Sequence, residues 1–195
     1  MISTELIIKW MNVIRHEKHN RDRILECFWD SQLKSKEWLC SELPKFENPI
    51  SVVIHGAWYG TLAGMLLDSN NIAQIECVDI DPSCERYVRM FTMDDRVTSA
   101  TCDMSEYKYT FFPDVVINTS CEHISDETYL SWYSKIPDGS IVVIQSNDMD
   151  HVEDHINCVY SIEQFLDKSG IRNPSYYGEK VMPNGNRRFM IIGEK

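Results

Sequence analysis

The first 45 residues repeat polar and apolar positions with the period of a helix. Apolar side chains recur at steps of three and four residues, the spacing that places them on one face of an amphipathic helix. A proline at position 44 ends this region, because the residue before a proline avoids the helical conformation. We therefore expect residues 1–45 to form an N-terminal helical cap. The helical steps are at Leu6, Ile7, Trp10, Met11 and Ile14, and again at Leu33, Trp38, Leu39 and Leu43.

From residue 46 onward, short apolar runs alternate with helical stretches. Strands that are apolar throughout and flanked by helices are typical of a parallel sheet covered on both faces. Near the end, Pro183-Asn-Gly-Asn186 is a hairpin signal between two further strands. We predict a doubly wound α/β domain over residues 46–195, with a mostly parallel seven-stranded sheet and a C-terminal antiparallel hairpin strand. The predicted strands are 51–55, 74–79, 96–101, 114–118, 140–145, 175–182 and 187–193, and the predicted helices are 61–67, one opening at Pro82, 126–135 and one from Ser161 to near Gly170.

Composition narrows the class of protein. Hydrophobic residues make up 43% of the 195-residue chain, which is enough for a buried core, and no apolar run has the length of a membrane span. Seven cysteines, an odd number without a CxxC pair, indicate free thiols in a reducing cytoplasm. A formal net charge of −11 disfavours a nucleic-acid partner, because an acidic surface repels phosphate backbones. We expect a cytoplasmic protein that acts on a small molecule.

The residues just after each predicted strand are the candidates for a site, because open parallel sheets bind ligands at the carboxyl ends of their strands. Gly56 and Gly60 follow the first strand and permit a tight turn and a close backbone approach. Asp79 ends the second strand, where a carboxylate can accept hydrogen bonds from both ribose hydroxyls of a nucleoside. Asp103 and Met104 follow the third strand, where the carboxylate can accept from an adenine amino group. A structural turn, a helix cap and a solvated loop residue are the respective alternatives.

Together these motifs resemble those of class I S-adenosylmethionine-dependent methyltransferases. The resemblance covers residues 48–195 and rests on the glycine-bearing loop, the VDIDP strand tip, the aspartate after the third strand, the segment DVVINTSCEHIS and the terminal hairpin. It implies a Rossmann-like fold with S-adenosylmethionine as the cofactor. It also implies that the glycine loop passes the amino-acid part of the cofactor, that Asp79 with Ile80 holds the ribose, and that Asp103 with Met104 marks the adenine pocket.

The first loop departs from the family pattern at two positions. The family has an acidic residue two positions before the first glycine and a further glycine inside the loop, where this sequence has Ile54 and Trp58. A tryptophan there either narrows the cofactor pocket or lines its edge. We therefore expect Trp58 to contact the cofactor and to change the posture of its methionine end.

Polar side chains gather after the fourth and fifth predicted strands, where a methyl acceptor would be held in line with the cofactor. Such residues at strand ends suit hydrogen bonding better than they suit a core. His123 can accept a proton from an amine or hydroxyl group, with Glu122 orienting the histidine or the substrate. A structural role at the start of a helix is the alternative for His123. The predicted catalytic residues are Asn118, Glu122, His123, Gln145 and Asn147.

A second polar run follows the fifth strand. His151 and His155 are four residues apart, so on a helix they would share one face and a metal ion. A solvated loop over the site and a surface for an amine substrate are the alternatives, and we expect no metal in the site. We expect Cys121 to be a packed thiol rather than a nucleophile.

The sequence therefore predicts an enzyme, an S-adenosylmethionine-dependent methyltransferase that transfers a methyl group in line to N or O of a small polar molecule. An acceptor that carries an amine is one candidate. Two alternatives remain. One is an aminocarboxypropyl transferase or cyclase that uses the same cofactor and releases methylthioadenosine. The other is a non-catalytic module that binds an adenosyl ligand.

Overall fold

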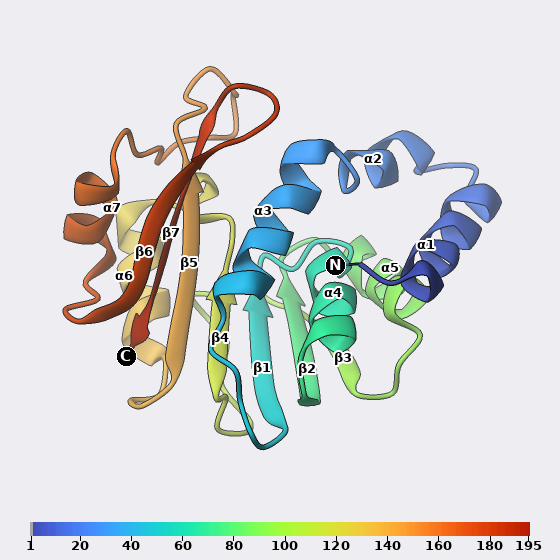
Figure 1. Cartoon of the computed structure of the whole chain (residues 1–195), viewed down its shortest axis with the longest axis horizontal. Helices are drawn as coiled ribbons and strands as arrows, with labels where there is room; N and C mark the ends of the chain where they lie inside the picture. Colours follow the sequence, from blue (N-terminus) through green and yellow to red (C-terminus); the bar gives the residue numbers. More distant parts are fainter. Residues whose placement is uncertain (1) are drawn as a thin grey trace.

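A computed structural model describes residues 2–195 and contains one seven-stranded sheet between two layers of helices (Figure 1). The strands lie in the order β3-β2-β1-β4-β5-β7-β6. β7 pairs antiparallel with both of its neighbours, whereas the pairs among β1 to β5 are parallel. The predicted Rossmann-like α/β sheet with its C-terminal hairpin is thereby confirmed. The strands are β1 (Ile50–His55), β2 (Ile72–Asp79), β3 (Val97–Thr101), β4 (Val115–Asn118), β5 (Ile141–Asn147), β6 (Pro174–Val181) and β7 (Arg187–Glu194).

The strand order reverses between β1 and β4. The chain moves outward from β1 to β2 and β3, then returns to the other side of β1 to form β4. At such a switch point the loops after the two strands diverge to opposite faces and leave a crevice at the carboxyl ends. The predicted site residues follow these same strands.

Helices cover the two faces of the sheet unequally. One face carries α3 (Asp30–Glu42), α4 (Thr61–Ser69) and α5 (Ser83–Thr92), whose apolar side chains pack on Val52, Ile54 and Ile117. The other face carries α6 (Asp126–Lys135) and α7 (Ile162–Ser169), packed on the alternate strand positions such as Val116 and Ile144. Over β1 and β2 on this second face, the loop 102–114 takes the place of a helix and inserts Tyr107.

The N-terminal region contains two helices besides α3. The first is α1 (Thr4–His16), which contains the predicted helical steps from Leu6 to Ile14. The second is the short α2 (Arg21–Glu26), which the sequence pattern did not predict. Leu6 and Trp10 of α1 form an apolar cluster with Tyr59, Tyr87 and Phe91, so this region packs on α4 and α5. In Figure 1 the segment from α2 to α3 lies above the carboxyl ends of β1 and β2. The division into a cap (1–45) and a binding domain (46–195) stays a prediction.

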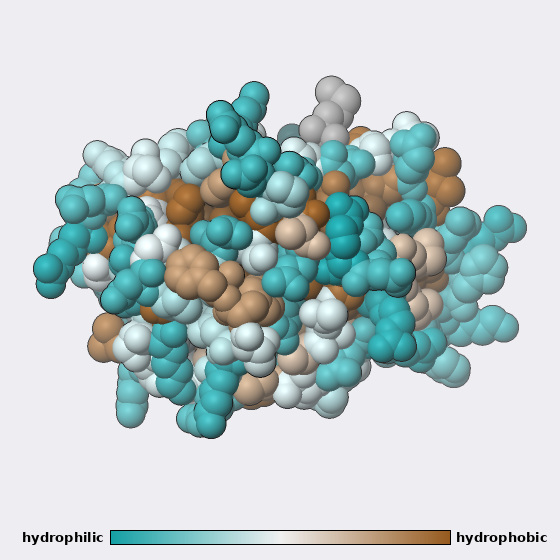
Figure 2. Space-filling model, turned by 90° about the horizontal axis from the view of Figure 1, so that it is seen from below, coloured by the Kyte–Doolittle hydropathy of each residue, from teal (hydrophilic) through white to brown (hydrophobic). Residues whose placement is uncertain are grey.

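The opposite end of the molecule has a mixed surface. Figure 2 views the side at the amino ends of the parallel strands, where hydrophilic side chains are spread with apolar groups between them. Among residues 2–195, no helix has both the length and the apolar character needed to cross a bilayer.

Candidate functional site

A cavity of about 770 Å³ opens at the carboxyl ends of β1, β2 and β4, beneath α2 and α3. This volume lies within the range of about 300–1,000 Å³ that is usual for small-molecule sites. Of the predicted cofactor-binding residues, all but Gly60 line the cavity. Those that line it are Gly56, Trp58, Asp79, Ile80, Asp103 and Met104.

The loop between β1 and α4 is built from left-handed residues. Gly56 has φ +62° and Gly60 has φ +79°, a conformation that suits glycine. A Cβ atom on Gly56 would lie 2.8 Å from the Ser120 hydroxyl, so the loop approaches the β4 tip closely. A Cβ atom on Gly60 would lie 3.2 Å from the Val88 Cα atom. Gly60 therefore lets α4 pack closely against α5. Its role is structural, because it does not line the cavity.

Trp58 also adopts the left-handed conformation, with φ +50°. For a residue with a Cβ atom this conformation costs roughly 1–2 kcal/mol. Its N–H donates to the Asp79 Oδ2 atom at 2.7 Å, which fixes the strained turn to the tip of β2. The side chain is half-buried beside Tyr59 and lines the cavity. The tryptophan thus keeps the backbone conformation of a glycine and brings an indole ring to the cavity wall.

Asp79 is the carboxylate at the end of β2, beside the exposed side chain of Ile80. Its Oδ1 atom accepts from the Asp81 N–H at 3.0 Å, and its Oδ2 atom accepts from Trp58. Each carboxylate oxygen has two lone-pair sites, so Asp79 retains acceptor capacity toward the cavity. Asp103, in the loop after β3, accepts from the Ser105 N–H and lines the same cavity with Met104.

The tip of β4 supplies a buried glutamate. Glu122 and His123 belong to the short 3-10 helix η1 (Cys121–His123), and both line the cavity. Glu122 is 2% exposed, and its Oε1 atom accepts from Asn147 at 2.6 Å and from the Arg188 Nη1 atom at 3.1 Å. Burial raises the pKa of Cys121 well above its usual value, as expected of a packed thiol.

The other three predicted catalytic residues lie behind the cavity wall. Gln145 accepts from the Arg188 Nε atom at 3.3 Å and donates to the Ser35 carbonyl of α3 at 3.2 Å. Asn118 is fully buried and accepts from the Ser120 N–H at 2.9 Å. Asn147 bonds to Glu122, as described above. None of the three is among the residues that line the cavity, so each contacts residues of the wall instead.

Three cations of the site were missed by the sequence reasoning. Arg23 of α2, Lys36 of α3 and Arg188 of β7 all line the cavity. Lys36 is only 8% exposed and donates to the Gln32 side chain at 2.7 Å. Burial, with the nearby charge of Arg188, lowers the pKa of Lys36 to about 8. A signal was present, because Lys36 stands three residues from both Leu33 and Leu39 and therefore on the buried helix face.

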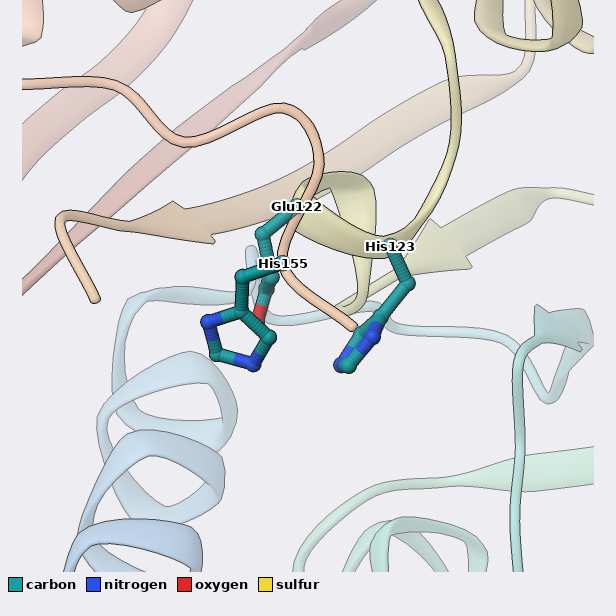
Figure 3. A group of neighbouring side chains, drawn as sticks. All are labelled: Glu122, His123 and His155. Carbon is teal, nitrogen blue, oxygen red and sulfur yellow. The ribbon is translucent and has the colours of Figure 1, made fainter. Parts of the chain in front are cut away.

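His123 and His155 come together beside Glu122 (Figure 3). Their ring centroids are 4.6 Å apart and their planes are nearly perpendicular. One potential ligand atom from each of the three side chains lies within 4.8 Å of the others. His151 is exposed and does not belong to this group. Residues 151–155 form turns, so the helical pairing of His151 with His155 does not occur.

No protein-family model matches the sequence, and no curated protein sequence matches it. Solved structures do match. The N-methyltransferase NodS from Bradyrhizobium japonicum WM9, in complex with S-adenosyl-L-homocysteine, has a TM-score of 0.71 and 8% identity over 96% of this chain and 98% of that chain. The 1,6-didemethyltoxoflavin-N1-methyltransferase of Burkholderia thailandensis has a TM-score of 0.68 and 14% identity over 100% and 91%.

A third match has a different acceptor chemistry. The geranyl diphosphate C-methyltransferase of Streptomyces coelicolor A3(2), in complex with Mg²⁺, geranyl diphosphate and S-adenosyl-L-homocysteine, has a TM-score of 0.65 and 14% identity over 92% of this chain and 84% of that chain. At such low identities the likeness concerns the arrangement of the backbone, not the acceptor. The chain has the Rossmann-like fold of S-adenosylmethionine-dependent methyltransferases.

Proposed function

We propose that this protein is an S-adenosylmethionine-dependent methyltransferase that transfers a methyl group to N or O of a small polar molecule. The observation that carries the proposal is the cavity at the switch point of the sheet, with the Asp79 carboxylate and the left-handed glycine loop in its wall. The fold shared with methyltransferases supports it.

The cofactor would occupy the side of the cavity formed by β1, β2 and β3. Asp79 has free lone pairs toward the cavity and would accept hydrogen bonds from the ribose hydroxyls, with Ile80 against the sugar. Asp103 and Met104 would bound the adenine. Gly56 would let the backbone pass the amino-acid part, and the Trp58 indole would lie against the methionine end.

The acceptor would lie on the side formed by η1, α3 and β7. His123 is exposed to the cavity and would take the proton that an amine or hydroxyl acceptor loses. Lys36 would bind an acidic or hydrogen-bond-accepting group of the acceptor, because none of the ion pairs among residues 2–195 includes this buried ammonium. Much of the rate would come from holding the acceptor in line with the methyl group.

Asn118, Gln145 and Asn147 would act as positioning residues. Asn147 holds Glu122, and Gln145 connects Arg188 to the backbone of α3. Substitution of either residue would therefore displace a charged side chain of the cavity wall without removing a contact to the substrate.

The first experiment measures the melting temperature with and without S-adenosylmethionine, S-adenosylhomocysteine and methylthioadenosine. A ligand at about a hundred times its Kd adds about 2.7 kcal/mol, which raises the midpoint by roughly 5–10 °C in a domain of this size. The variant Asp79→Asn should lose most of this shift. Asp94→Asn is the matched control, because Asp94 pairs with Arg96 at 2.7 Å and neither residue lines the cavity. An absent shift, or equal losses in the two variants, would refute the proposed cofactor site.

The product identifies the bond that breaks. Methyl transfer releases S-adenosylhomocysteine, whereas aminocarboxypropyl transfer or cyclisation releases methylthioadenosine. The second reaction is kept as a candidate on one observation, the Trp58 ring at the cavity wall in place of a loop glycine. Cofactor binding without either product, over a screen of amine and hydroxyl acceptors, would favour a non-catalytic binding module.

A further inference from the structure

We infer that Glu122, His123 and His155 form a binding site for one divalent transition-metal ion at the acceptor side of the cavity. The three side chains come from two segments, η1 and the loop after β5, and extend from the same side of their backbones (Figure 3). One carboxylate and two imidazoles are donors that such ions accept.

Only one carboxylate oxygen of the buried Glu122 is hydrogen-bonded among the described residues. Its Oε1 atom takes the hydrogen bonds from Asn147 and Arg188, whereas its Oε2 atom is buried and has no hydrogen-bond partner among the described residues. A buried carboxylate oxygen without a partner is costly, and a native structure rarely keeps one without a reason. The Nδ1 atom of His155 is likewise buried without a partner. Glu122 and His155 thus each have a buried polar atom without a partner, and one potential ligand atom of each lies within 4.8 Å of the other. An ion bound between the two side chains would satisfy groups that the described residues leave unpaired.

The third ligand is already oriented. The Nδ1 atom of His123 lies 3.1 Å from the carbonyl oxygen of Asp154. An imidazole that donates from Nδ1 to a backbone carbonyl presents the lone pair of Nε2, the arrangement common in metal-binding histidines. A second bond, from the Asn157 N–H to the Glu122 carbonyl at 3.0 Å, fastens the same loop to η1. His155 is therefore held over Glu122 by bonds on both sides of it in the chain.

The neighbouring charges restrict the kind of ion. Arg188 contacts Glu122 directly, and the charge of Glu122 acts on Lys36. These cations weaken any site that relies on charge alone, so Mg²⁺ and Ca²⁺, which prefer oxygen ligands, would bind poorly. Ions that bond strongly to imidazole, such as Zn²⁺ and Co²⁺, would be favoured. Ligand distances of about 2.0–2.2 Å require a small inward rotation of the side chains, which the exposed His123 permits.

The role of the ion rests on the proposed function, although the site itself does not. Three protein ligands leave at least one coordination position open. Because Glu122 and His123 line the cavity, that position would face the acceptor. An oxygen or nitrogen of the acceptor bound there would be fixed beside the cofactor. With the ion bound, His123 would serve as a ligand and not as the base, and the ion would instead promote loss of the acceptor's proton by lowering the pKa of the coordinated group.

The test uses the full chain, treated with a chelator and dialysed, and titrated with Zn²⁺ alone by calorimetry and with Co²⁺ alone by visible absorption. We expect one ion per chain, with affinity lowered at least tenfold by His155→Ala and by His123→Ala. His151→Ala is the matched control, because His151 is an exposed histidine four residues before His155 and outside the group. Circular dichroism and the melting temperature establish that each variant is folded.

The inference is overturned if neither ion binds at micromolar concentration, or if His155→Ala binds Zn²⁺ as well as His151→Ala does. S-adenosylhomocysteine binding is measured in parallel on the same samples. A His155→Ala protein that binds S-adenosylhomocysteine but not Zn²⁺ supports the metal site. Zn²⁺ binding in a wild-type protein that binds no adenosyl ligand supports the metal site and refutes the proposed function.

Discussion

Replacing Arg188 with methionine should destabilise the protein strongly. Methionine keeps much of the side-chain volume but leaves the buried Glu122 carboxylate without its cation, 3.1 Å away. Removing one partner of a buried ion pair costs roughly 3–5 kcal/mol, because the remaining charge stays desolvated. In a domain of this size 1 kcal/mol shifts the melting temperature by about 2–4 °C, so the expected loss is roughly 6–20 °C.

The adjacent arginine supplies the control for this prediction. Arg187 pairs with Asp148 at 2.9 Å, but its side chain is 36% exposed. This half-buried pair is more accessible to solvent than the Arg188–Glu122 pair, whose side chains are 12% and 3% exposed. Because solvent weakens an ion pair toward the roughly 0–1 kcal/mol of surface pairs, Arg187→Met should cost clearly less stability than Arg188→Met. Urea denaturation gives the free energy of unfolding for both variants. An Arg188→Met protein that loses no more stability than Arg187→Met would show that the buried pair is not the cause.

A double-mutant cycle isolates the pair itself. Glu122→Gln removes the negative charge and keeps the shape of the side chain. If the two charges depend on each other, the Arg188→Met/Glu122→Gln protein should be more stable than the sum of the single losses predicts, by about 0.5–3 kcal/mol. Strict additivity would refute the reasoning, because it would mean that each side chain acts through other contacts.

Three further predictions concern the framework of the site. Gly60→Ala should destabilise by more than Gly185→Ala in urea denaturation, because both have left-handed φ values but a Cβ atom at Gly185 meets nothing within 4 Å; equal losses would contradict the close packing of α4 on α5. Burial lowers the pKa of His55 to about 3, so as the pH falls below 6.5 the unfolded chain takes up a proton there that the folded chain does not. The free energy of unfolding therefore decreases as the pH falls, by up to about 1.4 kcal/mol per pH unit. His55→Gln should reduce this pH dependence between pH 7 and pH 5, and an unchanged dependence would show that His55 is not its source. Iodoacetamide should modify the half-buried Cys102 and spare the buried Cys121 in the folded protein, with urea-unfolded protein as the control in mass spectrometry; labelling of Cys121 at the rate of Cys102 would contradict its burial.

The order of strands and helices was predictable because it depends on local patterns. The apolar runs and the Asn-Gly turn placed all seven strands to within a few residues, and residues 126–135 form the predicted helix. The six-residue α2 was missed because it is too short to show a helical period. The resemblance to methyltransferases also indicated which residues after the strands would line a cavity. Asp79 and Asp103 are two of these residues, and both line it.

The charged part of the site was harder to predict because it depends on contacts between distant segments. Arg188 alternates with Met190 and Ile192 on the buried face of β7, yet only the tertiary structure shows that it meets Glu122. The pairing of His155 with His123 depends on turns after β5, for which the sequence contains no periodic signal. Trp58 shows a third limit, because its left-handed backbone follows from the fixed turn and not from a preference of tryptophan.

The insertion of β7 between β5 and β6 has a consequence for aggregation. Ile141–Asn147 is apolar over most of its length and is hydrogen-bonded on one side by β4 and on the other by β7. If β7 detached, β5 would become a long apolar edge with unpaired N–H and C=O groups, which is a template for association with other chains. The strand that brings Arg188 to the cavity therefore also shields the middle of the sheet. A mutation that loosens β7 would be expected to reduce solubility together with ligand binding.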